Sequence, residues 1–257
     1  MQRTLVALKS FSEILQEKSP LAIRTVGTAA LRRASNGDDF VNKVAEQTNL
    51  NLEIIDGHQE AVLCSLGVLE ALSPRPKNSL IIDIGGGSTE LVLLEDCQIL
   101  FRESYPLGVV RLCEETTDDS ERNAVIDDVL EQFKNSLIQR GLLAKVQSSD
   151  CEFIGTAGTA TTLAALEQRM ESYDWSKINN HILSLATLEK QQTDLSTLTV
   201  SQREELPGLE AGRGDLIIPG IQILLSLTKG FSRPHIRVSD FGLLEGVLLD
   251  HSNSSSD

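Results

Sequence analysis

The feature that most constrains this chain is a strand–turn–strand segment at residues 80–94, in which an aspartate near the end of an apolar strand is followed by a glycine triplet. Glycine can adopt backbone angles closed to other residues, so the amides of Gly85, Gly86 and Gly87 can point at phosphate oxygens. Asp83 is suited to bind a divalent cation or to orient an attacking water. The segment predicts a phosphate-binding β-hairpin, although a hairpin whose glycines only satisfy the turn would have the same sequence.

The residues after the triplet exclude two common phosphate-binding motifs. Ser88 and Thr89 offer hydroxyl donors, but no Gly-Lys-Ser or Gly-Lys-Thr follows, so the turn is not a P-loop. A strand comes next instead of a helix, which is wrong for the dinucleotide-binding fingerprint. A hairpin is therefore favoured over either nucleotide-binding loop.

A second turn of small residues lies within residues 153–166, where an apolar strand ends at Gly155 and Thr156 and an apolar helix follows. A helix N-terminus with small residues is a ready anion site, which makes Gly158 and Thr159 candidate phosphate ligands. A tight strand-to-helix turn with a threonine cap would explain the same residues without any ligand. The sequence leaves both interpretations open.

Charged side chains occur at two further junctions between a strand and a helix. Glu60 falls in the first turn of a helix that follows a strand, where a carboxylate stabilises the helix dipole but is also placed to act as a general base. Arg32 and Arg33 follow an expected strand at residues 22–28. A planar guanidinium suits phosphate, although surface arginines are more often simply solvated.

The apolar pattern divides the chain at the proline-containing segment 73–78. Before it, helices and short strands alternate, which predicts a first unit at residues 1–76. After it, three consecutive strands are followed by mostly helical sequence up to a short strand near residue 235, which predicts a second unit at residues 77–250. Residues 251–257 have no apolar content and are expected to form a disordered tail.

The formal net charge of −14 argues against a nucleic-acid partner, because affinity for the phosphate backbone comes mostly from lysine and arginine. A phosphate-rich ligand must then bind at a local site of arginines, amides or a metal ion. No apolar run approaches the roughly 20 residues of a membrane span, and the first residues do not form a signal-peptide core. We expect a cytoplasmic protein without a membrane partner. The four cysteines and four histidines show no metal-ligand spacing.

Six segments, taken in order, resemble the Ppx/GppA family of exopolyphosphatases and guanosine pentaphosphate phosphohydrolases. They are TAALRRA, DGHQEA, LIIDIGGGSTEL with YPLGVVRL, IGTAGTATTLAAL, GRGDLIIPG and SDFGLLEG. The resemblance implies a two-lobed α/β fold with ribonuclease-H-like lobes, as in actin, sugar kinases and acetate kinase, and a phosphate-binding cleft between them. It also implies a first phosphate loop of the Asp-x-Gly-Ser-Asn-Ser type ahead of the opening helix. No such motif precedes that helix in residues 1–257, so we expect an N-terminally truncated first lobe.

The resemblance also gives a role to individual residues. Glu60 matches the family's catalytic glutamate, and Arg32 matches its phosphate-contacting arginine. Asp83 and Glu90 match positions near the metal and phosphate, which implies a bound Mg²⁺ or Mn²⁺ ion. With the second turn included, the candidate phosphate-binding residues are Arg32, Gly85, Gly86, Gly87, Ser88, Gly158 and Thr159.

The implied reaction is metal-dependent hydrolysis of a terminal phosphoanhydride, releasing orthophosphate from inorganic polyphosphate or from guanosine pentaphosphate. A homodimer is a further expectation from the resemblance. Two other functions compete with hydrolysis: a non-catalytic protein that binds polyphosphate or the alarmone and has lost the first phosphate loop, and a sugar or acyl kinase of the same superfamily. Phosphate release that is lost in Glu60→Ala would favour the hydrolase, and binding without turnover would favour the regulator.

Overall fold

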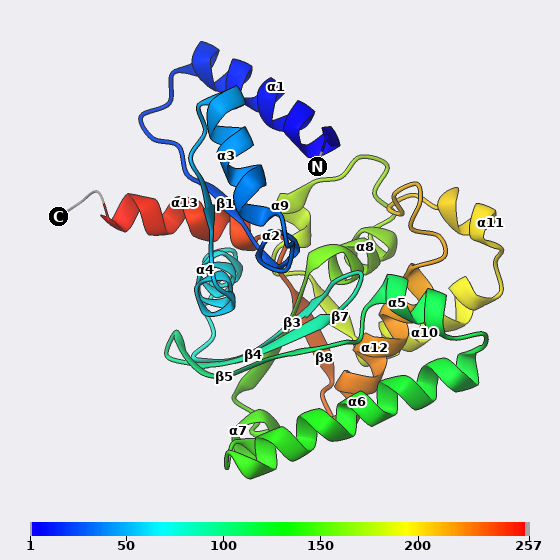
Figure 1. The fold of residues 1–257 in the computed structure, drawn as a ribbon. Helices are drawn as coiled ribbons and strands as arrows, with labels where there is room; N and C mark the ends of the chain where they lie inside the picture. The colour runs from blue at the N-terminus through cyan, green and yellow to red at the C-terminus, as the bar shows by residue number, and fades with distance from the viewer. Residues whose placement is uncertain (1, 255–257) are drawn as a thin grey trace.

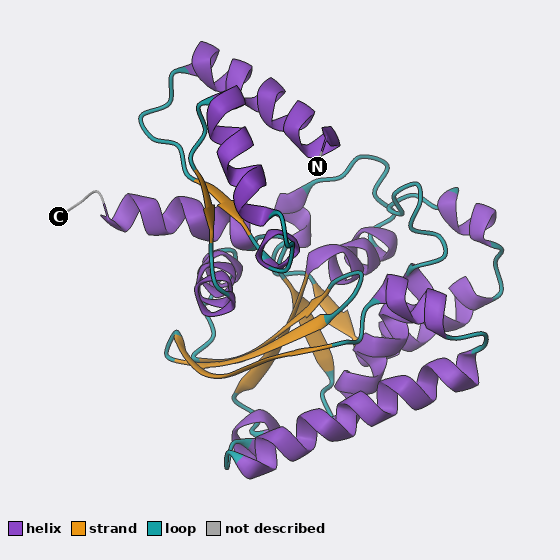
Figure 2. Ribbon diagram, viewed as in Figure 1, coloured by secondary structure: helices purple, strands orange, loops and turns teal. Residues whose placement is uncertain are grey.

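Two β-sheets of unequal size organise the chain, as Figures 1 and 2 show. The computed structural model describes residues 2–254, with side chains through residue 250. The smaller sheet pairs β1 (Thr25–Gly27) with β2 (Leu52–Ile54) in parallel. The larger sheet has six strands in the order β5-β4-β3-β6-β8-β7. Within the described residues, none of the helices is long and apolar enough to cross a membrane.

The larger sheet begins as an antiparallel meander and continues with parallel strands. The meander consists of β3 (Asn78–Ile84), β4 (Thr89–Glu95) and β5 (Gln98–Tyr105). Strands β6 (Cys151–Thr156) and β8 (His235–Val238) run parallel to β3, and β7 (Ile182–Ser184) lies antiparallel at the edge. A meander extended by parallel strands on helical crossovers is the ribonuclease-H-like arrangement expected for the second unit.

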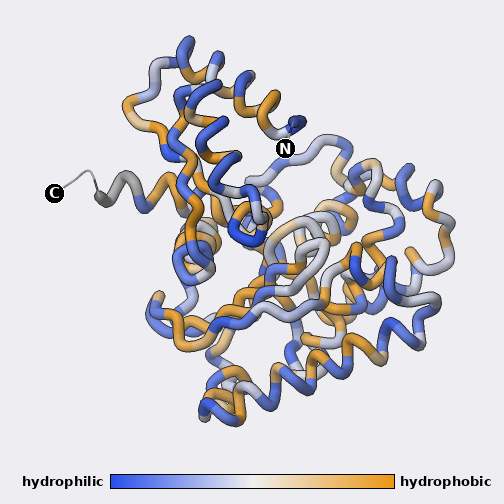
Figure 3. Tube along the Cα trace, viewed as in Figure 1, coloured by the Kyte–Doolittle hydropathy of each residue, from blue (hydrophilic) through white to orange (hydrophobic). Residues whose placement is uncertain are grey.

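Side chains alternate between the two faces of this sheet because successive residues of a strand point in opposite directions. Leu80 and Ile82 pack into the main core, whereas Ile81 faces the opposite side. The main core is covered by helices that follow the meander, including α12 (Ile217–Gly230), which is apolar nearly all round and correspondingly buried. Figure 3 shows α6 alternating between apolar and polar residues, as expected of a helix that packs on one face. The remaining helices are α5 (Val109–Glu115), α6 (Asp119–Gln139), α7 (Leu143–Gln147), α8 (Ala157–Glu167), α9 (Trp175–Ile178), α10 (Leu185–Ser196) and α11 (Val200–Glu204).

The first unit has a much smaller core. Its helices are α1 (Gln2–Lys18), α2 (Ala29–Arg32), α3 (Gly37–Thr48) and α4 (Gly57–Glu70). The buried cluster between α1, α3 and β2 contains Leu5, Phe40, Val44, Leu50 and Leu52.

Helix α4 joins the two sheets. On one side Val68 and Leu69 pack against the meander, and on the other Leu63 packs with Val247 of α13 (Leu243–Ser254). Helix α13 includes residues 251–254, so this part of the expected disordered tail is helical; residues 255–257 lie outside the described chain. The helix that carries Glu60 is therefore held from both sides.

Two glycines allow α4 and α13 to approach this closely. A methyl group on Gly246 would lie 1.7 Å from the carbonyl oxygen of Leu63, and one on Gly67 would lie 2.0 Å from that of Gly242. We expect Gly246→Ala to lower the free energy of unfolding by about 3 kcal/mol, because the backbones must separate to admit the methyl group. Urea denaturation should show a lower midpoint with an unchanged slope. Gly242→Ala is the matched control, since a methyl group there meets nothing within 4 Å; equal losses in both variants would contradict this explanation.

Candidate functional site

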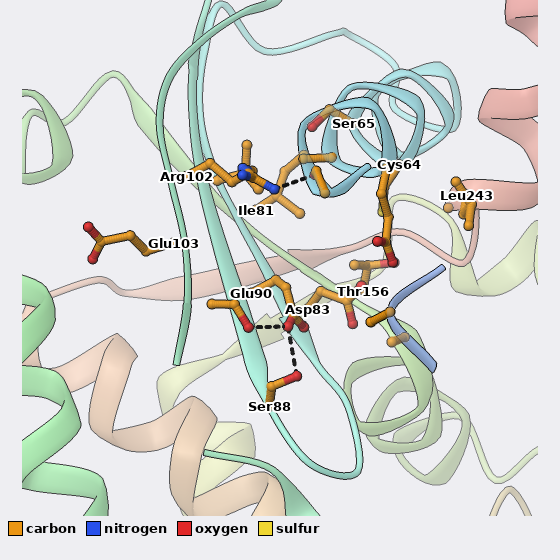
Figure 4. A pocket seen from close by; sticks show the side chains of 18 of the residues that line it. Cys64, Ser65, Ile81, Asp83, Ser88, Glu90, Arg102, Glu103, Thr156 and Leu243 are labelled. Atoms are coloured by element: carbon orange, nitrogen blue, oxygen red, sulfur yellow. Dashed lines mark hydrogen bonds between the residues drawn. The ribbon is translucent and has the colours of Figure 1, made fainter. Parts of the chain in front are cut away.

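A cavity of about 410 Å³ lies between the first turn of α4 and the face of the meander that α4 covers (Figure 4). Helix α2 and the turn from β6 to α8 complete its walls. The ionisable side chains lining it are Arg32, Arg33, Glu60, Cys64, Asp83, Glu90, Arg102, Glu103 and Asp240.

The register of the meander brings three polar residues together on one face. Asp83 of β3 pairs with Glu90 of β4, and Glu90 pairs in turn with Ser104 of β5. Residues directly opposite each other in an antiparallel pair point to the same face, with Cβ atoms about 5 Å apart. The strands therefore form a polar row across the floor of the cavity.

Glu90 is held in place by two hydroxyl groups. Ser88 Oγ donates to Glu90 Oε1 at 2.7 Å, and Ser104 Oγ donates to the same oxygen at 2.6 Å. Because both donors use Oε1, the second oxygen is left for a ligand.

Asp83 is the residue of this row whose ionised form is disfavoured. Burial raises its pKa from the ordinary 3.8 to about 6, and the neighbouring carboxylates of Glu90 and Glu60 add to the effect. Its carboxylate accepts no hydrogen bond from the described residues. A cation at this point would relieve both the burial and the repulsion.

The carboxylates at the cavity meet part of what a divalent ion needs. No group of three His, Cys, Asp or Glu side chains in the described chain is arranged to hold a metal by itself. Asp83 and Glu90 nevertheless provide two hard carboxylate ligands on adjacent strands. Mg²⁺ commonly binds through one or two carboxylates and completes its shell with water and substrate phosphates. The residues present therefore fit a magnesium-type site that is completed by substrate.

Glu60 faces this cavity from the first turn of α4. That turn is capped by Asp56, which accepts a hydrogen bond from the backbone N–H of Gln59 at 2.8 Å. Arg32 reaches across from α2 and donates to Glu60 Oε2 at 3.1 Å and to the carbonyl oxygen of Ile55 at 2.7 Å. The side chain of Glu60 is therefore oriented toward the cavity, beyond any effect on the helix dipole.

The glycine turn presents amide groups while its carbonyls are occupied. The carbonyl oxygens of Gly85 and Gly86 accept hydrogen bonds from the first amides of α5. The N–H groups of Gly86, Gly87 and Ser88 donate to no group in the described chain. Thr89, by contrast, uses its buried hydroxyl on the carbonyl of Leu107, so it is not free to bind a ligand as the sequence suggested.

The second turn of small residues faces a neighbouring cavity of about 270 Å³, which Gly85 and Gly86 also line. Gly158 and Thr159 belong to this second cavity and not to the first, and Ala157 lines both. Arg213 covers Gly158 so closely that a methyl group there would lie 1.9 Å from its Nη1 atom. Both glycine turns therefore line the second cavity, and they reach the first cavity only through Ser88, Thr156 and Ala157.

Ser104 and Arg102 belong to the site but were not predicted from the sequence. They lie two residues apart on β5, so both point to the face that α4 covers. The sequence signal for these two residues is the alternation of side chains along the strand. It assigns them to the cavity face only once the register of β5 with Glu90 is known.

The comparisons with known proteins agree on one family. The model of the Ppx/GppA phosphatase family matches residues 1–255. A bifunctional 3-dehydroquinate synthase/phosphatase of Fusobacterium nucleatum is 31% identical over 97% of this chain, which spans only 38% of that protein. Exopolyphosphatase 2 of Mycobacterium tuberculosis is 28% identical over 96% of this chain and 80% of its own length.

Solved structures give the same result. The Ppx/GppA family member of Aquifex aeolicus superposes with a TM-score of 0.83 at 29% identity, covering 100% of this chain and 82% of that one. An exopolyphosphatase from Cytophaga hutchinsonii gives 0.82 at 28% identity, covering 98% and 82%. The two-lobed α/β fold predicted from the sequence is confirmed.

Proposed function

This chain belongs to the Ppx/GppA phosphatase family, and on that premise we propose that it is an exopolyphosphatase, which releases orthophosphate from the end of inorganic polyphosphate. The observation that carries the proposal is the convergence of three carboxylates and Arg32 on one cavity, which the glycine turn reaches at Ser88, whose amide is unbonded in the described chain. The names of the mycobacterial and Cytophaga relatives support the same substrate.

Each requirement of phosphoryl transfer has a candidate group in this pocket or at the glycine turn beside it. The amides of Gly86, Gly87 and Ser88, with the guanidinium of Arg32, bind the oxygens of the terminal phosphate. Glu60 accepts a proton from water, whose oxygen forms the new bond to phosphorus. The bond from phosphorus to the bridging oxygen breaks, and that oxygen leaves as the new anionic end of the shortened chain.

We propose that Asp83 and Glu90 hold Mg²⁺ or Mn²⁺ in this reaction. When bound, such an ion supplies charge neutralisation at the phosphate oxygens. Asp83 contributes a carboxylate that has no other partner in the described chain, and Glu90 contributes the oxygen that its two serine donors leave free.

Orthophosphate release from long-chain polyphosphate is therefore expected to require a divalent ion. Removal of the ion with EDTA should lower the rate by about 100-fold or more, because several kcal/mol of charge stabilisation are lost. Added Mg²⁺ or Mn²⁺ should restore it. Glu90→Gln should raise the Mg²⁺ concentration needed for half-maximal rate. Metal-independent release would contradict the ion site, and no release with either ion would contradict the proposed activity.

Guanosine pentaphosphate is the second candidate substrate, and the neighbouring cavity is the observation in its favour. Val109, Val110, Leu216 and Ile217 give it apolar walls next to the glycine turn, as a nucleoside would need. The ratio of kcat/KM for the two substrates distinguishes the candidates. A preference for guanosine pentaphosphate that is lost when Val110 is replaced by aspartate would favour the nucleotide.

A further inference from the structure

Besides Arg32, a second arginine reaches the first turn of α4, and it comes from the opposite lobe. Arg102 lies on β5, and its Nη1 atom donates a hydrogen bond to the carbonyl oxygen of Gly57. If Gly57 carried a Cβ atom, that atom would lie 2.8 Å from Arg102 Nη1 and 3.6 Å from Arg32 Nη2. Two guanidinium groups from different lobes therefore flank the residue at which α4 begins.

Arg33 and Arg102 differ from Arg32 in their charge partners, and the charge of Arg102 interacts with the carboxylate of Asp56 without forming an ion pair. Neither side chain forms an ion pair with a carboxylate in the part of the chain that the structure describes, whereas Arg32 is paired with Glu60. Glu103, the sequence neighbour of Arg102, is already bonded to Arg140 at 2.6 Å and to the hydroxyl of Tyr105. Both arginines line the same cavity, so their guanidinium groups are available to an anionic ligand there.

Arg102 lies apart from the carboxylates of Asp83 and Glu90, whereas Arg32 is paired with Glu60. Figure 4 shows Asp83, Glu90 and Ser88 gathered together, with Arg102 well apart from them. The carboxylates suit a metal ion and water, and the separate arginines suit anionic groups that are not themselves being hydrolysed. The planar guanidinium group binds phosphate with two parallel hydrogen bonds.

We propose that Arg33 and Arg102 bind the phosphates that precede the terminal one, so that this pair selects long polyphosphate over short. The inference rests on the proposed exopolyphosphatase function. A pyrophosphate has only one phosphate besides the one released, so we expect it to engage at most one of the two arginines. Longer chains engage one arginine from each lobe, and the hydrogen bond from Arg102 to Gly57 is exchanged for one to phosphate.

Contacts of this kind are made equally in the ground state and the transition state, so they should appear in KM and not in kcat. We expect Arg102→Ala and Arg33→Ala each to raise KM for long-chain polyphosphate by about tenfold, because a hydrogen bond to a charged group is lost. Hydrolysis of pyrophosphate should change little. Arg102→Lys should recover part of the affinity. Arg75→Ala is the matched control, since Arg75 is exposed and paired with Glu70 outside the cavity.

Direct binding separates this inference from the proposed function. Calorimetric titration of the same variants with long-chain polyphosphate should show the tenfold loss without reference to turnover. If Arg102 instead only fixes α4, its removal will lower kcat on every substrate and leave binding unchanged, which overturns the inference while the wild type still hydrolyses polyphosphate. A wild type that neither binds nor hydrolyses polyphosphate overturns the proposed function, and the inference with it.

Discussion

Replacing Glu60 by glutamine is expected to lower kcat for polyphosphate hydrolysis by about 1,000-fold, with KM nearly unchanged. Glutamine has the shape of glutamate and can still accept the hydrogen bond from Arg32, so the pocket should keep its geometry. It cannot accept a proton from water, and a positioned general base contributes about 100- to 10,000-fold to a rate. Initial rates of orthophosphate release with saturating Mg²⁺ measure the effect.

Glu103 provides the matched control because it lines the same cavity but is engaged elsewhere. Its carboxylate bonds to Arg140 and Tyr105, and Figure 4 shows it directed away from Asp83 and Glu90. Glu103→Gln should hydrolyse polyphosphate at close to the wild-type rate. Full activity in Glu60→Gln would remove Glu60 from the chemistry and leave it a role at the helix dipole. A wild type that binds polyphosphate without turnover would instead favour the non-catalytic alternative.

The glycine hairpin could be predicted from sequence because its signal is local. An apolar strand, a carboxylate, three glycines and a second apolar strand define the turn without reference to the rest of the chain. The structure places Asp83 near the end of β3 and leaves the amides of Gly86, Gly87 and Ser88 unbonded in the described chain. The amide of Gly85, which was also expected to bind phosphate, instead donates to the carbonyl oxygen of Ser88 within the turn. The binding roles of these residues stay predictions until a ligand is tested.

Features that depend on pairing between distant segments could not be predicted in the same way. Ser104 reaches Glu90 only because β5 pairs with β4 in one particular register, and a shift of one residue would point it to the other face. The strand expected at residues 22–28 has only three residues, Thr25–Gly27. Strand β7 lies in sequence expected to be helical, and its three residues are too few to show an alternating pattern.

The contact between α13 and α4, which joins the two units, could not be predicted from the sequence either. Gly246 and Gly67 look like ordinary helix-weakening residues until the two helices are seen in contact. These glycines matter because they allow the backbones of α4 and α13, which are distant in sequence, to approach each other closely. Predictions of domain boundaries from composition do not detect such a contact, because it leaves no local trace.

Asp83→Asn is expected to abolish most hydrolysis and, at the same time, to stabilise the metal-free protein at neutral pH. Asp83 is held by burial and by Glu90 at a pKa of about 6, above its ordinary 3.8. A rise of about two pKa units corresponds to about 3 kcal/mol between folded and unfolded states. Because the cavity admits water, we expect about 1–2 kcal/mol of this as a gain on replacing the carboxylate by an amide.

The stability difference between Asp83→Asn and the wild type is expected to depend on pH. Well below pH 3.8, at about pH 2 to 3, Asp83 is protonated in both the folded and the unfolded state, so the variant and the wild type should be similarly stable. As the pH rises from 4 to 6, the unfolded chain loses the proton first, and the wild type loses stability relative to the variant. The difference should be complete above about pH 7. Urea denaturation in EDTA across this range, with Glu103→Gln as the control for loss of a cavity carboxylate, measures it.

Added Mg²⁺ should reverse the order of stability. An ion that binds the folded state raises its stability with concentration, and Asp83 is the ligand that the variant lacks. We therefore expect Mg²⁺ to stabilise the wild type and to leave Asp83→Asn nearly unchanged. A variant that is less stable than the wild type in EDTA at pH 8 would show that the Asp83 carboxylate has a partner that balances its burial. Equal stabilisation of both proteins by Mg²⁺ would place the ion elsewhere.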